Sequence, residues 1–211
     1  MVVQKQHKIS IHNQIIKRIT QKGKGNIFFP SDFVDFGSPD AVRQSLSRLT
    51  NDKIIERLAH GVYLYPKHNP LLGTLYPSTE EIAVAIAKRD KARIIPTGLF
   101  ALHKLGLSTQ VPMKVVYLTD GTARKIQLGK QSITFKNTSP KKLSIKGGNT
   151  SLVIQALRQL GKKQATMQML KTVKTILARE DTKLIEEDAL LAPAWIAQIL
   201  FSIIKERKAN D

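Results

Sequence analysis

Hydrophobic residues recur at helical spacing near the start of the chain. From Ser10 to about Lys22 the isoleucines stand three or four residues apart, which predicts an amphipathic helix. A second helix is predicted to begin after Ser38, whose side chain can cap free backbone N–H groups. Pro39 needs no N–H at that position, and Asp40 meets the positive end of the helix dipole. The chain therefore opens with two helices that should pack on a common core.

The second predicted helix has one apolar side and one polar side. Val42, Leu46 and Leu49 share the apolar side. The polar side carries Arg43, Gln44, Ser47 and Arg48. Side chains of these types can hydrogen-bond to base edges in the major groove of DNA. The intervening residues 28–37 predict a short apolar strand followed by a short helix.

A strand, a tight turn and a second strand follow the polar-faced helix. Residues 54–58 and 62–65 are apolar-rich, and the turn between them contains Gly61. Helix, short helix, polar-faced helix and hairpin in this order are typical of a winged helix-turn-helix. The sequence predicts such a DNA-binding domain over residues 1–70. The same pattern also occurs in protein-docking modules.

Polar and basic residues around this domain are the candidate DNA contacts. Those of the polar helix face, Arg43, Gln44, Ser47 and Arg48, would meet bases or adjacent phosphates. The residues expected mostly to position the DNA backbone are Lys17, Arg18, Lys53 and Arg57, with His60 at the tip of the hairpin.

The second part of the chain mixes short strands with helices. Residues 66–73, with two prolines and a glycine, predict a linker, and a helix follows from about residue 77. A strand at 93–95 and a helix at 97–105 precede three strands at 114–118, 123–128 and 132–136. Turn residues at 120–122 and 129–130 predict two successive hairpins. Further helices are expected at about 150–160, 165–177, 182–191 and 193–205.

These elements predict an α+β fold in two domains. The N-terminal winged helix-turn-helix is followed, over residues 71–211, by a larger mixed α/β C-terminal domain that ends in a helical segment. Its small mixed sheet is expected at about 92–137 and its helices at about 150–205. A chain of 211 residues is long enough for two such domains.

Positive charge is present in both parts of the chain. The net charge is +18, and residues 1–70 hold 11 basic and 5 acidic residues. Residues 121–179 hold 13 basic residues and no acidic one. This predicts a second positive surface, which would bind nucleic acid or an acidic protein. Its candidate residues come in adjacent pairs at expected turns or element ends: Arg124, Lys125, Lys141, Lys142, Lys162 and Lys163. The alternative is a generally basic protein whose excess charge is scattered.

No pattern of residues predicts catalysis. Cysteine is absent and the five histidines are dispersed, so neither a metal site nor a cofactor is expected. Asp32 and Asp35 are expected to cap and to be solvated, and Asp120 to lie in a turn. Residues 186–188, two glutamates and an aspartate, are expected to form a solvated helix face. We therefore predict that the protein is not an enzyme.

The ends of the chain bear on location. Residues 1–8 lack the apolar core of a signal peptide. The apolar run from Ala189 to Ile204 is interrupted by polar residues and is short for a bilayer, so a packed C-terminal helix is expected. We predict a cytoplasmic protein with no membrane partner.

Four stretches resemble the AbiEi-type (type IV) antitoxins of bacterial toxin–antitoxin pairs. They are AVRQSLSRL at 41–49, RLAHGVYLYP at 57–66, TGLFALHKLGL at 97–107 and QVPMKVVYLTDG at 110–121. The similarity extends from about residue 15 to residue 204. One departure is His60, where the family leads us to expect Arg or Lys, and a neutral histidine would grip DNA less strongly.

The resemblance implies a winged helix that binds inverted repeats in double-stranded DNA at the operon's own promoter. It also implies a C-terminal domain that opposes a partner nucleotidyltransferase toxin without needing a stable complex. We accordingly predict a DNA-binding antitoxin and transcriptional autorepressor, with RNA as a further candidate partner. The alternatives are a winged-helix regulator without a toxin, and an RNA-binding or nucleic-acid-modifying protein that acts through residues 121–179.

Overall fold

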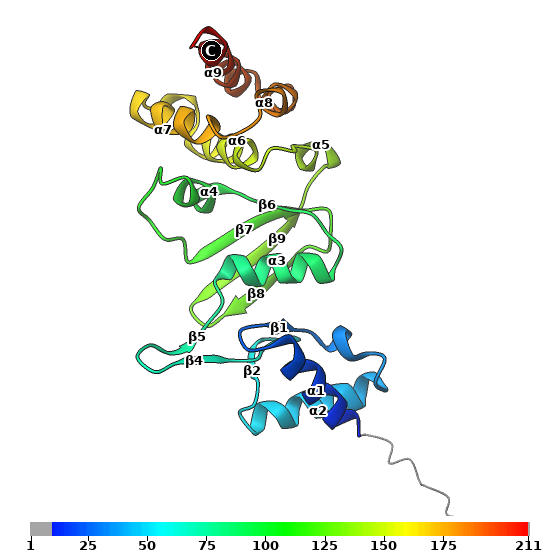
Figure 1. The fold of residues 1–211 in the computed structure, drawn as a ribbon. Helices are drawn as coiled ribbons and strands as arrows, with labels where there is room; N and C mark the ends of the chain where they lie inside the picture. The colour runs from blue at the N-terminus through cyan, green and yellow to red at the C-terminus, as the bar shows by residue number, and fades with distance from the viewer. Residues whose placement is uncertain (1–9, 211) are drawn as a thin grey trace, which may run out of the picture. The chain divides into compact units, whose positions relative to one another are not determined.

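The computed structural model describes residues 10–210, and the chain divides into two compact units between Ala85 and Ile86 (Figure 1). The expectation about a signal peptide in residues 1–8 lies outside the described residues. Each unit is built around its own helices and sheet, and together they give a mixed α+β protein, as the sequence predicts.

The N-terminal unit combines two main helices with a small antiparallel sheet. In chain order its elements are α1 (Ile11–Lys22), β1 (Ile27–Phe28), the 3-10 helix η1 (Pro30–Phe33), α2 (Pro39–Asn51), β2 (Glu56–Ala59), β3 (Val62–Leu64), β4 (Lys67–Asn69) and β5 (Gly73–Leu75). The strands β1, β3 and β2 form a three-stranded sheet in that order. The predicted Ser38 cap is present, with Ser38 Oγ accepting from Ala41 N at 3.3 Å, and Ser10 Oγ similarly accepts from Asn13 N at 3.2 Å at the start of α1.

The core of this unit comes from the apolar sides of the two helices. Ile15 and Ile19 of α1 and Leu46 and Leu49 of α2 are buried. Phe28 and Phe33 stack between them, with ring centroids 6.1 Å apart. Burying this apolar side leaves the polar side of α2 in solvent.

The segment expected to be a linker is instead a hairpin. Strands β4 and β5 pair antiparallel, and Asn69 Oδ1 accepts from the backbone N–H groups of Leu71 and Leu72 at 2.8 and 3.0 Å. Beyond the hairpin, Tyr76 Oη donates to Glu56 at 2.7 Å, which ties the chain back to β2. The first compact unit consequently extends well past residue 70, because the proline- and glycine-rich sequence makes a turn.

The C-terminal unit contains a four-stranded mixed sheet followed by helices. Helix α3 (Thr79–Arg89) crosses the unit boundary, and the later elements are β6 (Ile94–Pro96), α4 (Gly98–Lys104), β7 (Lys114–Thr119), β8 (Arg124–Leu128), β9 (Gln131–Asn137), α5 (Pro140–Leu143), α6 (Gly148–Leu160), η2 (Lys162–Gln164), α7 (Met167–Leu177), α8 (Thr182–Ala189) and α9 (Ala194–Asn210). The predicted strands and helices therefore exist, with small differences at their ends.

The order of the strands in the sheet differs from the order that two successive hairpins would give. The sheet runs β6-β7-β9-β8, with β7 and β9 parallel and β8 antiparallel on the far side of β9. The predicted β7–β8 hairpin is thus wrong. Ile133 and Phe135 of β9 are buried, whereas β8 alternates half-buried and exposed residues, so the more apolar strand occupies the interior. The second hairpin is confirmed, with Gly129 in its two-residue turn at φ +56°.

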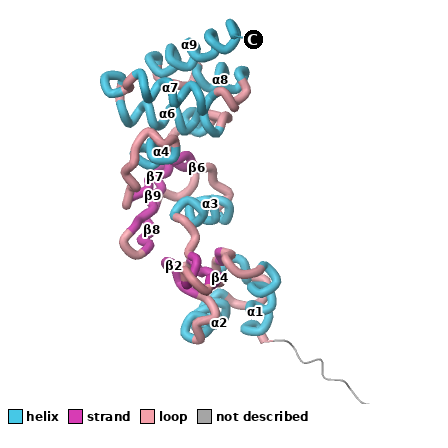
Figure 2. The backbone as a smooth tube through the Cα atoms, turned by 60° about the vertical axis from the view of Figure 1, so that its left-hand side comes forward, coloured by secondary structure: helices cyan, strands magenta, loops and turns pink. Residues whose placement is uncertain are grey.

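Helices α4 and α6 to α9 form the second core (Figure 2). Val153 and Leu157 of α6 are fully buried with Val173 of α7 and Leu200 of α9. The long apolar run of the sequence is therefore covered by neighbouring helices. Among residues 10–210, no helix is long and apolar enough to cross a membrane.

Candidate nucleic-acid interface

The exposed side of α2 presents four polar side chains in a row. All four side chains are exposed: Arg43 lies one helical turn before Ser47, and Gln44 lies one turn before Arg48. Their backbone is held from behind by the buried apolar side of the same helix. The sequence-predicted set is thus brought together on one rigid element.

Arg43 is already paired within the helix. Its Nη2 donates to Asp40, which lies one turn earlier, and the two side chains are 61% and 86% exposed. An ion pair this exposed contributes little to stability, so a stronger anion could displace the carboxylate at small cost. Arg43 is therefore oriented by Asp40 and remains accessible.

The hairpin of β2 and β3 carries a second polar pair. Arg57 Nη2 lies 2.8 Å from His60 Nδ1, and both side chains are exposed. A guanidinium can only donate, so His60 Nδ1 accepts this hydrogen bond. The turn itself depends on Gly61, whose φ is +68°. His60 thus orients Arg57.

Arg18 on α1 is committed to contacts within the unit. It forms two hydrogen bonds of 2.7 Å with Asp35 and donates to the Asp32 carbonyl at 2.7 Å. Its guanidinium also lies 3.9 Å from the centroid of the Phe36 ring. The hydrogen bond from Arg18 lowers the pKa of Asp35, and the same bond raises the pKa of Arg18. Arg18 therefore braces α1 against the segment that precedes α2.

Two other predicted backbone contacts are exposed lysines. Lys17 is free on the outer side of α1, beside a hollow of about 410 Å³ that Gln14, Arg18, Gln21 and Phe36 also line. Lys53 follows the end of α2 in a left-handed conformation, with φ of 56°. Both lysines belong to the same unit as the α2 residues.

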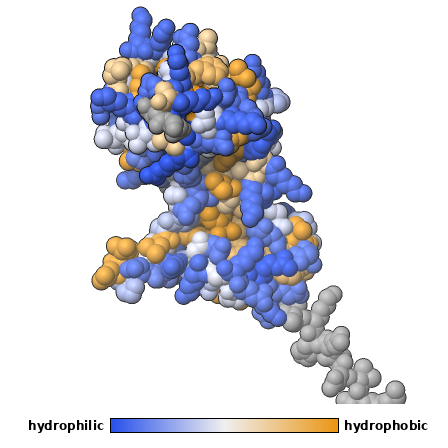
Figure 3. Space-filling view, turned by 45° about the horizontal axis from the view of Figure 1, so that its top comes forward, coloured by the Kyte–Doolittle hydropathy of each residue, from blue (hydrophilic) through white to orange (hydrophobic). Residues whose placement is uncertain are grey.

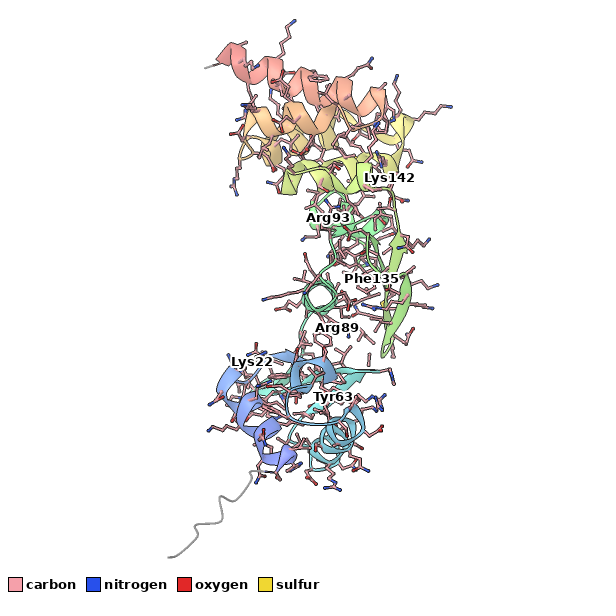
Figure 4. All side chains as sticks on the ribbon, turned by 90° about the vertical axis from the view of Figure 1, so that its right-hand side faces the viewer. Lys22, Tyr63, Arg89, Arg93, Phe135 and Lys142 are labelled. Carbon is pink, nitrogen blue, oxygen red and sulfur yellow. The ribbon has the colours of Figure 1, made fainter. Side chains whose placement is uncertain are left out.

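Five of the six candidate basic residues in the C-terminal unit are exposed. These are Lys125, Lys141, Lys142, Lys162 and Lys163, and Figure 4 labels Lys142 on α5. Arg124 is different, because it is half-buried, pairs with Asp90 and lies 5.5 Å from the Phe135 ring centroid. Neighbouring residues of a strand point to opposite faces, so Arg124 and Lys125 do not form a surface pair.

Carboxylates from outside residues 121–179 neutralise part of this basic segment. Lys146 Nζ lies 3.0 Å from Glu187, and Lys174 pairs with Glu206. These contacts join residues that are far apart in sequence. The segment therefore has less unpaired positive charge than its own sequence, which contains no acidic residue, suggests.

The sequence predicts that residues 186–188 form a solvated helix face, but Asp188 is not solvated. Asp188 is buried and accepts from the backbone N–H groups of Lys146 and Gly147 at 2.9 and 2.8 Å. Glu180 accepts from Asn149 N and Thr150 N at 2.9 and 3.2 Å. Together they bind the free N–H groups at the start of α6.

The other carboxylates have similarly local partners. Asp32 accepts from Phe29 N at 2.9 Å, which confirms its capping role. Asp120 accepts hydrogen bonds from the backbone N–H of Arg93 at 2.7 Å and from the side chain of Arg93 at 2.8 Å. Among residues 10–210, no group of three histidine or acidic side chains gathers at a spacing suited to a metal ion.

Sequence reasoning missed one exposed apolar feature. Leu71 and Leu72, at the tip of the β4–β5 hairpin, are 94% and 76% exposed, and Figure 3 shows hydrophobic surface there. The signal was available, because Asn69-Pro70 and Gly73 flank the two leucines as turn residues do.

Comparison with known proteins assigns a family without a function. Residues 14–185 match the model of DUF6088, described as a family of unknown function, so the chain belongs to that family. No curated protein matches the chain. The crystal structure of the RV2827C protein from Mycobacterium tuberculosis aligns with a TM-score of 0.45 and 11% identity, over 92% of this chain and 81% of that one. This likeness is too distant to carry an argument, and the similarity to AbiEi-type antitoxins stays a prediction.

Proposed function

We propose that the protein is a DNA-binding antitoxin that represses its own operon, with the N-terminal unit acting as a winged helix-turn-helix. The observation that carries this proposal is the row of Arg43, Gln44, Ser47 and Arg48 on the exposed side of α2. These residue types read base edges, and the helix that bears them is fixed by a buried core.

The contacts around α2 support a division of roles. Lys17 and Lys53 are exposed single charges suited to phosphates, which set register without reading sequence. Arg57 would meet the backbone from the hairpin, oriented by His60. Arg18 would act indirectly by keeping α1 in place, because Asp35 already occupies its guanidinium.

The test compares promoter binding by Arg43→Ala, by Arg48→Ala and by the double variant with binding by the unaltered chain. Loss of a base contact should cost about 1–3 kcal/mol and relax specificity at one position. Loss of a phosphate contact should weaken binding to promoter and scrambled fragments alike. Fluorescence anisotropy with both fragments measures the two effects.

A matched control removes two exposed charges from the other unit. Arg179→Ala with Lys183→Ala changes net charge by the same amount as the Arg43/Arg48 double variant and should leave promoter specificity intact. If the α2 variants fold and still bind promoter like the unaltered chain, the assignment of α2 as the reading helix is wrong.

The antitoxin role is assigned to the C-terminal unit, on the resemblance to AbiEi-type antitoxins and on its exposed lysines. It is tested by expressing the chain with the product of a neighbouring gene. Rescue of growth from a nucleotidyltransferase-type toxin supports the proposal. Promoter binding without any rescue would instead favour a regulator that has no toxin partner.

A further inference from the structure

One face of the four-stranded sheet carries lysines on three neighbouring strands. Lys114 of β7 is opposite Ser132 of β9, and Lys136 of β9 is opposite Leu118 of β7. Lys125 of β8 is opposite Thr134 of β9. Residues directly opposite one another lie on the same face of a sheet, so the register places all three lysines together.

The two faces of this sheet are very different. On one face Tyr117, Ile133 and Phe135 are buried, and Phe135 lies with Ile86 and Ala87 of α3 around a small internal gap. On the other face Lys114, Lys125 and Lys136, here called the sheet lysines, are exposed. Between them Val116, Leu118 and Thr134 are only half-buried, whereas Ser132 on the same face is buried. The part of this face around the sheet lysines is therefore accessible, and it is called the open face below.

The charges on the open face are not neutralised. Within residues 10–210 none of the sheet lysines has an ion pair, whereas Arg124 on the covered face pairs with Asp90. Lys125 and Lys136 are diagonal neighbours on adjacent strands, so their positive potentials add. An open face of this kind attracts an extended anion.

The composition of the face favours nucleic acid over protein. The centres of protein interfaces are rich in aromatic residues, methionine and arginine and poor in lysine, whereas this face offers lysines around two half-buried aliphatic residues. Lysines flanked by hydroxyl groups are the usual partners of a phosphate backbone. Thr134 also offers a hydroxyl beside Lys125, and the 2′-hydroxyl of RNA can pair with it.

We propose that the open face of the β6-β7-β9-β8 sheet binds single-stranded RNA, with the sheet lysines contacting its phosphates and Thr134 a 2′-hydroxyl. This site goes beyond the proposed function. It lies outside the N-terminal unit, so promoter binding can succeed or fail independently of it.

The test uses the full chain and a labelled oligouridylate, which has weakly stacking bases and so isolates backbone contacts. Replacing Lys114, Lys125 and Lys136 by Gln should weaken binding about tenfold at roughly 0.1 M salt. The slope of log affinity against log salt should fall by about 2, since three phosphate contacts are lost. Binding of duplex promoter DNA should not change.

A control variant, Lys171→Gln with Lys183→Gln and Lys205→Gln, removes the same charge from exposed positions on the helical part. It should bind the oligouridylate like the unaltered chain. A second variant, Thr134→Val, keeps the shape of the side chain and removes its hydroxyl. It should weaken binding to the oligouridylate and leave binding to the matching deoxy oligomer unchanged.

Any of four results would overturn the proposal. The unaltered chain could fail to bind the oligouridylate at low salt. The sheet-lysine variant could bind as well as the unaltered chain, or the control variant could lose as much affinity, so that only total charge matters. Equal effects of Thr134→Val on the ribose and deoxy oligomers would overturn the choice of RNA.

Discussion

The two units of this protein hold their positive charges in different ways. In the N-terminal unit, three arginines are oriented by a neighbour: Arg18 by Asp35, Arg43 by Asp40 and Arg57 by His60. In the C-terminal unit Arg93 and Arg124 are likewise held by Asp120 and Asp90, but most of its exposed cations are lysines, among them the pairs Lys141-Lys142 and Lys162-Lys163.

This difference matters because arginine and lysine recognise anions differently. A guanidinium held in one direction offers a planar set of donors, which suits a bidentate contact to a base or a phosphate. A lysine on a flexible stem supplies a point charge with little directional preference. These preferences agree with the proposed function, in which the N-terminal unit reads a sequence and the C-terminal unit attracts an anion.

The largest expected effect is a loss of stability in the C-terminal unit, where Asp188 holds the start of α6. Asp188→Ala would leave the N–H groups of Lys146 and Gly147 without their acceptor. At about 1–3 kcal/mol for the buried N–H of Gly147, and less for the part-buried N–H of Lys146, the loss is about 2–4 kcal/mol of unfolding free energy. Chemical denaturation measures it. Glu187→Ala, at an exposed neighbouring position, should change stability little, and equal losses in the two variants would contradict this role for Asp188.

A smaller effect concerns the exposed lysine pairs. Reversing Lys141, Lys142, Lys162 and Lys163 to Glu should impair neutralisation of the toxin in cells, because a positive surface becomes negative. Promoter affinity should change only modestly, since these charges lie outside the N-terminal unit. The matched variant with Arg at all four positions keeps the charge and should neutralise normally. If the Glu variant neutralises the toxin fully, these lysines serve solubility and have no role in neutralisation.

The smallest effect comes from the brace between Arg18 and Asp35. Because the hydrogen bond from Arg18 lowers the pKa of Asp35, the pair stabilises the fold above the ordinary aspartate pKa of about 4. That contribution should disappear as the pH falls through the lower pKa of the folded state. Asp35→Asn should be slightly less stable at pH 7, and its stability should converge with that of the unaltered chain in acid. Melting temperatures across pH 2.5 to 7 check this, and parallel curves would exclude the linkage.

Several site residues were accessible to sequence reasoning because they follow local rules. The alternation of apolar and polar positions in α2 predicts that Arg43 and Arg48 are exposed, since Leu46 must be buried. The Ser38 cap and the Gly129 turn depend on neighbours within a few residues, and both appear where expected. The overall α+β class also follows from such local patterns.

Long-range pairing was not accessible in the same way. Local turn chemistry suggested a β7–β8 hairpin, but β9 lies between the two strands because it buries more apolar surface. The carboxylates that neutralise Arg124 and Lys146 come from Asp90 and Glu187, far away in the chain. These contacts depend on which residues lie close together in the folded chain, and spacing along the sequence does not show this.

By itself the sequence determined which segments form helices and strands, the exposed polar side of α2 and the excess of positive charge, because each depends on periodicity or composition. Only the tertiary structure decided which charges remain free. It paired Arg18 with Asp35, buried Asp188 against the start of α6 and left the sheet lysines open. The physical reason is that screening and desolvation act between groups that are close in space, and folding sets those distances.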